Sequence, residues 1–238
     1  MTIKPYKGIV LEFDEAKHRF FANGVPVKSV TGFTSVVDKS GPLMGWQEKI
    51  TKKFLLDKIN EGTEITEEVI VEACGQHRHK TKEASNLGTQ VHDWAEKFTL
   101  GQEPPMLEDE RAKNGVLAFL RWLDESKLKL FNPEEHIYSK KYNYAGIVDA
   151  QAKRGKKLVV IDYKTSNGIY NEMRYQTAAY QHALQEMTGK VYDERILVRF
   201  DKETADFHVH DLPDFKKDFN AFLACRALRL REDELKVH

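Results

Sequence analysis

Two neighbouring apolar runs that end in charged residues decide the fold: Gly146-Ile147-Val148-Asp149-Ala150 and Val159-Val160-Ile161-Asp162-Tyr163-Lys164-Thr165. The basic, glycine-containing segment between them predicts a turn that joins two antiparallel strands. Such pairing brings Asp149 and Asp162 to the same end of the hairpin. Because side chains alternate along a strand, Asp162 and Lys164 are expected on one face. Ile161 and Tyr163 are then expected on the other face.

Charged side chains at matched ends of apolar strands indicate a chemical role, because such strands rarely carry charges without partners. Asp149 and Asp162 offer oxygen ligands that suit Mg²⁺ or Mn²⁺. Lys164 beside such a cation can orient a water molecule or stabilise charge on a phosphate. The pattern therefore predicts metal-assisted hydrolysis of a phosphodiester. The competing interpretation is an ordinary ion pair at exposed strand ends.

Four motifs in this order resemble the RecB-like branch of the PD-(D/E)XK nuclease superfamily. They are Gly88-Thr89-Gln90-Val91-His92, Val148-Asp149, Asp162-Tyr163-Lys164 and Gln176-Thr177-Ala178-Ala179-Tyr180. The hairpin-like segment 8–31, with its Asn23-Gly24 turn signal and Ser29-Val30-Thr31, further resembles phage and mitochondrial RecB-like exonucleases. That family often has a proline where this chain has Lys28.

The resemblance implies an α/β (α+β) fold in which helices flank a mixed central β-sheet and a helical region precedes it. It also implies a site that holds Mg²⁺ or Mn²⁺. The metal ligands would be His92, Asp149, Asp162 and the backbone carbonyl of Tyr163. The catalytic residues would be Asp149, Asp162, Lys164, Gln176 and Tyr180.

Several of these residues have a second interpretation. Gly88, His92 and Glu96 recur every four residues and so share one helical face, but a lone histidine there is more often a surface residue than a ligand. Glu96 either steadies His92 or faces solvent. Glu135 is expected beside the site, and with Glu134 it also fits a solvated pair. Gln176 and Tyr180 also fit a buried helix face.

Contacts to DNA are expected from basic segments that have aromatic residues nearby, at 49–53, 77–82 and 140–141. Such segments can form an electrostatic groove with stacking platforms. A single run of charge is more often a solvated face. The residues predicted to bind DNA are Arg174, Lys140, Lys141, Arg78 and Trp46.

The composition narrows the class of protein. The chain has 238 residues, 41% of them hydrophobic, and Lys+Arg equals Asp+Glu at 37 each, so any phosphate binding is local. Cys74 and Cys225 are too few for a four-cysteine iron–sulfur cluster. The sequence has no Walker A loop, so no nucleotide cofactor is expected. Unwinding of duplex DNA would then need a helicase or recombination partner. No membrane segment or signal peptide is expected, which predicts a cytoplasmic protein, in the host cytoplasm if phage-encoded.

The apolar periodicity predicts helices within 43–127, interrupted at 103–105, and at 171–187 and 213–230. Strands are expected at 135–164, 195–200 and 206–210. We expect a single nuclease domain over 1–238, with the hairpin and helical region at 1–130 and the catalytic core at 131–238.

The activity that the resemblance implies is exonuclease action on single-stranded DNA with a free end, in DNA repair, recombination or phage genome processing. An endonuclease acting on duplex or branched DNA has the same chemistry. A non-catalytic DNA-binding module and an RNase are the remaining alternatives.

Overall fold

A computed structural model describes residues 1–236. The described residues form two compact units, one made of residues 1–37 with 90 onward and the other of residues 38–89. The described strands all lie in the first unit, whereas the second consists of two helices and the loop that joins them.

A five-stranded mixed sheet is the centre of the first unit. Its order is β11 (Phe207–Asp211), β10 (Glu194–Phe200), β9 (Lys157–Lys164), β8 (Ala150–Arg154) and β5 (Lys129–Phe131). β8 and β9 form the predicted antiparallel hairpin, while β10 runs parallel to β9. Helix α5 (Asn171–Thr188) lies between β9 and β10 in the chain, since a parallel pair needs a crossover. The mixed sheet with flanking helices confirms the α+β class.

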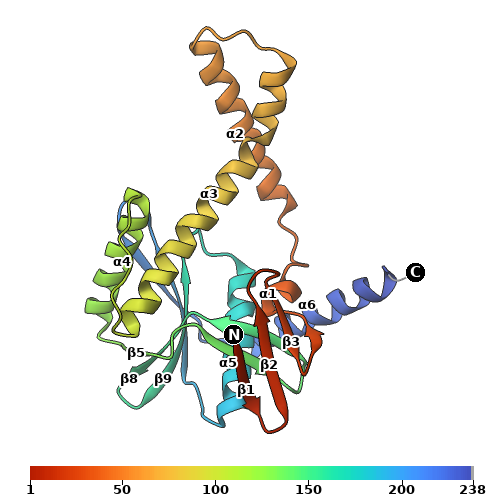
Figure 1. The fold of residues 1–238 in the computed structure, drawn as a ribbon, viewed down its shortest axis with the longest axis vertical. Coiled ribbons are helices and arrows are strands. Elements are labelled where there is room, and N and C mark those ends of the chain that lie inside the picture. Colours follow the sequence, from red (N-terminus) through yellow and green to blue (C-terminus); the bar gives the residue numbers. More distant parts are fainter. Residues whose placement is uncertain (237–238) are drawn as a thin grey trace. The chain divides into compact units, whose positions relative to one another are not determined.

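The two faces of this sheet are covered by different helices (Figure 1). Val159, Ile161 and Tyr163 of β9 pack in one cluster with α4 (Glu110–Ser126) and the end of α3 (Glu67–Thr99). Val160, on the opposite face, packs with α5 and α6 (Phe215–Leu235). The alternation predicted for β9 is therefore confirmed, and Asp162 and Lys164 share the face that α5 covers.

A second layer of strands lies beside α5. β6 (Glu135–Ser139) pairs with β7 (Tyr144–Val148), and the outer side of this pair packs on a meander formed by β1 (Thr2–Tyr6), β2 (Ile9–Asp14), β3 (Arg19–Ala22) and β4 (Val25–Val27). The expected β2–β3 hairpin and the Asn23-Gly24 turn are confirmed, and both turn residues have positive φ, as a type I′ turn requires. Short helix α1 (Val30–Thr34) follows.

The second unit is a helical hairpin. α2 (Ser40–Asn60) and the first two-thirds of α3 are joined by residues 61–66, and Thr51 Oγ1 donates to the carbonyl of Ala73 at 3.4 Å where the helices cross. The helices predicted within 43–127 and the break at 103–105 are confirmed by α2, α3 and α4.

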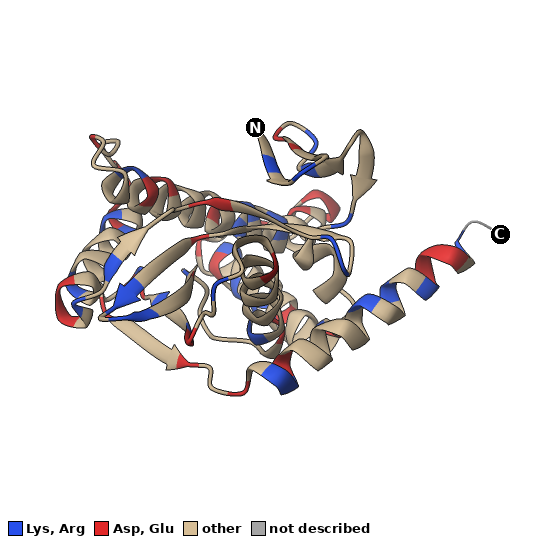
Figure 2. Ribbon diagram, turned by 90° about the horizontal axis from the view of Figure 1, so that it is seen from below, with Lys and Arg blue, Asp and Glu red and all other residues tan. Residues whose placement is uncertain are grey.

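Charge is spread over the elements. Figure 2 shows acidic and basic residues interspersed along the ribbon, including α6, in keeping with the equal numbers of the two. Over residues 1–236, every helix is either too short or too polar to cross a membrane.

Candidate active site

Asp149 and Asp162 meet at one end of the β8–β9 hairpin. Ala150 pairs with Ile161, so the register places Asp149 opposite Asp162. The Tyr163 amide donates to Asp149 Oδ2 at 2.6 Å, which ties the residue before β8 to β9. The predicted convergence of the two carboxylates therefore follows from the strand register.

Asp162 forms a buried pair with Lys164. Lys164 Nζ lies 2.5 Å from Asp162 Oδ2, and the Asp162 side chain is fully buried. The Gln176 side chain on α5 donates both to Asp162 Oδ1 at 3.2 Å and to the Tyr180 hydroxyl at 2.8 Å. The structure thus links Asp162, Lys164, Gln176 and Tyr180 in one network.

Gly146 leaves the space that the Tyr180 ring occupies. A Cβ at Gly146 would lie 2.8 Å from Tyr180 Cε1, closer than carbon atoms pack. Tyr180 is buried and, through its hydroxyl, fixes the Gln176 amide that reaches Asp162. The glycine in the stretch that decides the fold therefore positions the helix residues of the site.

His92 approaches from the other face of the sheet. A Cβ at Gly115 would lie 2.7 Å from Val91 Cγ2, so this glycine lets α4 pack closely on α3 beside His92. His92 Nδ1 lies 3.7 Å from Asp149 Oδ1 and 3.9 Å from Glu134 Oε1. Its ring meets the ring of Tyr163 edge-on, with centroids 5.9 Å apart.

Three of these side chains could hold a metal. Donor atoms of His92, Glu134 and Asp149 all lie within 4.8 Å of one another. Their side chains are 26%, 30% and 12% exposed, so a ligand can reach them from solvent. Asp162 was predicted as a ligand but is not one of these three residues. Its carboxylate contacts Lys164 and Gln176, and its neighbour Asp149 belongs to the group. The Tyr163 carbonyl stays a prediction as a ligand.

Sequence reasoning favoured Glu135, whereas the structure places Glu134 against His92. Glu134 has a positive φ of 49°, and its amide donates to the Asp149 carbonyl at 3.1 Å. Glu135 begins β6, opposite Val148, and burial raises the pKa of its carboxyl. The family resemblance pointed to a glutamate here, but no sequence signal separated the two neighbours.

The ionisable groups alter one another's pKa values. Burial raises the pKa of Asp149, although His92 and Lys164 oppose the shift. Burial also raises the pKa of Asp162 to about 6 against the effect of Lys164. For His92, burial acts to lower the pKa, but Asp149 and Glu134 outweigh it and raise the pKa to about 9. The carboxylates likewise outweigh burial at Lys164 and raise its pKa, so its amine is charged at neutral pH.

The residues predicted to contact DNA come from several elements, and their role stays a prediction. Arg174 Nε lies 3.7 Å from Asp218 Oδ1 of α6. Lys140 and Lys141 are exposed in the turn before β7, whereas Asp149 follows the end of that strand. Five residues of strand separate them by roughly 17 Å. Trp46 and Arg78 lie in the helical hairpin.

Glu96 lies one helical turn beyond His92 on α3 and is half-buried. Its predicted role beside the histidine stays a prediction.

Comparison with known proteins leaves this site without a family assignment. No protein-family model matches the chain, and no curated protein matches its sequence.

Proposed function

We propose that this protein is a divalent-metal-dependent deoxyribonuclease of the PD-(D/E)XK superfamily, which removes nucleotides from a free end of single-stranded DNA. The observation that supports it most is the convergence of the His92, Glu134 and Asp149 donor atoms next to the Asp162–Lys164 pair. Three carboxylates, an imidazole and a lysine that are all buried or partly buried cost free energy to bring together unless a ligand uses them.

The donor set fits a hard divalent cation. Carboxylate oxygens with one imidazole suit Mn²⁺ and, with retained waters, Mg²⁺. Glu134, Asp149 and Asp162 together carry more negative charge than Lys164 and a protonated His92 balance. The proton that His92 holds in the metal-free protein is one that a metal ligand must release. When bound, the cation would supply an activated water and charge neutralisation at the phosphate.

Lys164 is the residue that would contact the scissile phosphate. Its ammonium, held 2.5 Å from Asp162, can donate to a phosphate oxygen or orient the attacking water. Gln176 fixes the other oxygen of Asp162, so the carboxylate cannot rotate away from Lys164. Tyr180 in turn holds Gln176. These contacts preorganise the site, which is the protein's own contribution to phosphodiester hydrolysis.

The PD-(D/E)XK assignment is supported by how the sequence motifs lie in the fold. The two acidic motifs form one hairpin end, the Gln-x-x-x-Tyr motif lies on the helix after β9, and the histidine reaches the same end from α3. Action on a free DNA end and a helicase or recombination partner are parts of the proposal that rest on the family resemblance.

The test compares linear single-stranded DNA, covalently circular single-stranded DNA and linear duplex, each with Mg²⁺ or Mn²⁺, beside EDTA and Lys164→Ala controls. We expect the linear single strand alone to be degraded, and both controls to abolish the reaction. Lys156→Ala, an exposed lysine in the β8–β9 turn, is the matched control that keeps activity.

The other outcomes identify the alternatives. Cutting of circular DNA indicates an endonuclease with the same site. Cleavage of RNA but not DNA would make the protein an RNase. Binding without metal-dependent cleavage of any substrate would contradict catalysis and leave a binding module.

A further inference from the structure

The helical hairpin of residues 38–89 has almost no core of its own. All 21 residues of α2 are at least partly exposed, and within this unit only Ala73 and Leu87 are buried. Helices in proteins gain most of their stability from packing an apolar face. The hairpin therefore lacks the packing that would normally stabilise helices of this length.

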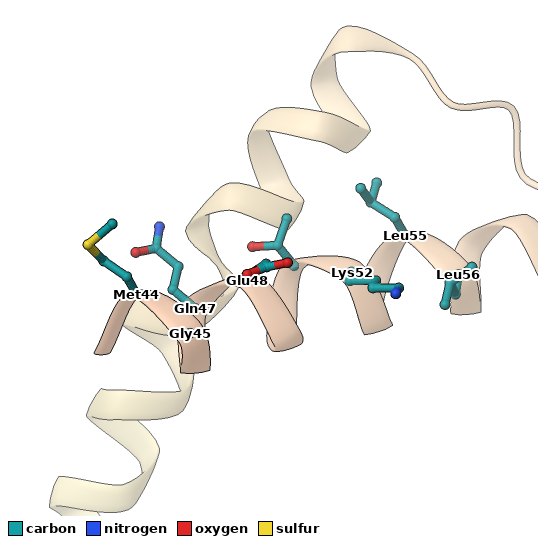
Figure 3. A pocket seen from close by; sticks show the side chains of 8 residues that line it. Met44, Gly45, Gln47, Glu48, Lys52, Leu55 and Leu56 are labelled. Carbon is teal, nitrogen blue, oxygen red and sulfur yellow. The ribbon is translucent and has the colours of Figure 1, made fainter. Parts of the chain in front are cut away.

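Large apolar side chains remain exposed along both helices. Met44 is 68% exposed, Ile59 55% and Val71 65%, and others in the unit are Leu43, Leu56, Ile65 and Ile70. A shallow hollow of about 630 Å³ follows α2 and is lined by Met44, Gln47, Thr51, Lys52, Leu55 and Leu56, among others. Figure 3 shows Met44, Gln47 and Leu55 rising from the same side of α2. Exposed apolar side chains gathered with polar ones around a hollow are typical of an interaction site.

Charge is segregated along the hairpin. The part nearest the connecting loop, residues 57–72, is the acidic end, with six acidic residues and one lysine. The part around and beyond the crossing, residues 46–53 and 77–83, is the basic end, with six Lys or Arg and two glutamates. The Thr51–Ala73 hydrogen bond lies near the division between the two ends.

We propose that this surface binds the same hairpin of a second copy of the chain, in an antiparallel arrangement with two-fold symmetry. A two-fold axis near the crossing would bring the acidic end of each copy against the basic end of its partner. The contact is then self-complementary, as a symmetric dimer requires, and both charge contacts are attractive. The exposed apolar side chains on the Met44 and Leu55 side of the two α2 helices meet between them, which gives each hairpin more of the packing that it lacks.

The charge pattern favours a second copy over nucleic acid at this surface. DNA would be attracted by the basic end but repelled by the acidic end of the same hairpin. A second hairpin satisfies both ends at once. This inference is independent of the proposed nuclease activity, because it concerns the hairpin alone and its test reads molecular mass.

The first experiment is sedimentation velocity of the full chain without DNA, from about 1 to 100 µM protein. We expect the mass to rise from one to two copies over this range. Met44→Glu, which places a charge among the apolar side chains on the Met44 and Leu55 side of α2, is expected to weaken the dimer at least about tenfold. A monomer throughout, or doubling of the mass only when DNA is added, would overturn the proposal.

Charge reversal provides the decisive test. One variant carries Lys49→Glu, Lys52→Glu and Lys53→Glu, so that both of its ends are acidic; the other carries Glu64→Lys, Glu67→Lys and Glu68→Lys, so that both are basic. Each alone should dimerise at least about tenfold more weakly, while an equimolar mixture should form the mixed dimer. Circular dichroism checks that both variants remain helical.

A triple reversal in the first unit, at the exposed Lys156, Lys190 and Lys216, is the matched control and should leave the dimer unchanged. A dimer that survives both hairpin reversals, or two variants whose mixture stays monomeric, would contradict the antiparallel contact.

Discussion

The sheet that carries the site and the helical hairpin bury their residues to very different extents. β9 buries five of its eight residues and has helices on both faces, whereas α2 buries none of its 21. Dense packing holds charged groups such as Asp162 and Lys164 in one geometry despite the cost of burying them. Chemistry is therefore expected where packing fixes the side chains, and association with a partner where apolar side chains stay exposed.

The largest effect is expected when the lysine of the site, Lys164, is removed. Lys164→Ala should lower the rate of DNA cleavage about 1,000-fold, because the charge at the phosphate is lost while the fold remains. Initial rates on a linear single strand with saturating Mn²⁺ measure the effect, and Lys156→Ala is the control. More than a tenth of the activity remaining in Lys164→Ala would remove this residue from the mechanism.

Two substitutions compare the packing of the regions directly. Phe119 is fully buried against Trp122, Tyr163 and Phe200, so Phe119→Ala should lower the free energy of unfolding by about 3–5 kcal/mol. Leu56, which is 48% exposed on α2, should cost about 0.5 kcal/mol or less when replaced by alanine. Urea unfolding of dilute protein measures both. Equal losses would show that the hairpin is packed in the isolated chain.

Substitutions of the adjacent residues Glu134 and Glu135 test which of them binds the metal. Glu134→Gln should weaken Mn²⁺ binding about 10- to 100-fold, because one of the three converging donors loses its charge. Glu135→Gln should leave Mn²⁺ binding unchanged, since this residue is part of β6. Isothermal titration of Mn²⁺ into each variant separates them. The reverse order of affinities would assign the ligand to Glu135.

The smallest effect on the cleavage rate is expected for Tyr180, at the edge of the hydrogen-bond network around Asp162. Tyr180→Phe should slow cleavage about threefold to tenfold, because Gln176 loses one partner but keeps its bond to Asp162. Tyr192→Phe removes another buried hydroxyl, one bonded to Gln151, and should reduce stability by about 1 kcal/mol without changing the rate. A rate loss shared by both variants would indicate a general packing effect.

Local pattern predicted much of this molecule. The Asn23-Gly24 turn, the alternation along β9 and the hairpin register that unites Asp149 with Asp162 depend on short-range geometry, so the sequence was sufficient. The same holds for the helix that places Gln176 and Tyr180 on one side.

Other features needed the assembled chain. Strand β1 carries no clear alternation, and its pairing with β2 depends on packing of the meander against β6 and β7. The sequence did not indicate that the packing of α5 on α6 places Arg174 beside Asp218, and its contact with DNA stays a prediction. The division into two units has no composition shift or linker to mark it, since α3 continues from one unit into the other.

By itself, the sequence determined the long helices, the β2–β3 and β8–β9 hairpins and which end of the β8–β9 hairpin is charged, because these follow from side-chain period and turn chemistry. Only the tertiary structure distinguished Glu134 from Glu135, because Glu134, in a turn with positive φ, lies against His92, whereas Glu135 begins β6 and pairs with Val148. It also showed that His92 meets Asp149 across more than 50 residues of chain. Contacts between distant segments depend on how whole elements pack, and no local pattern encodes that packing.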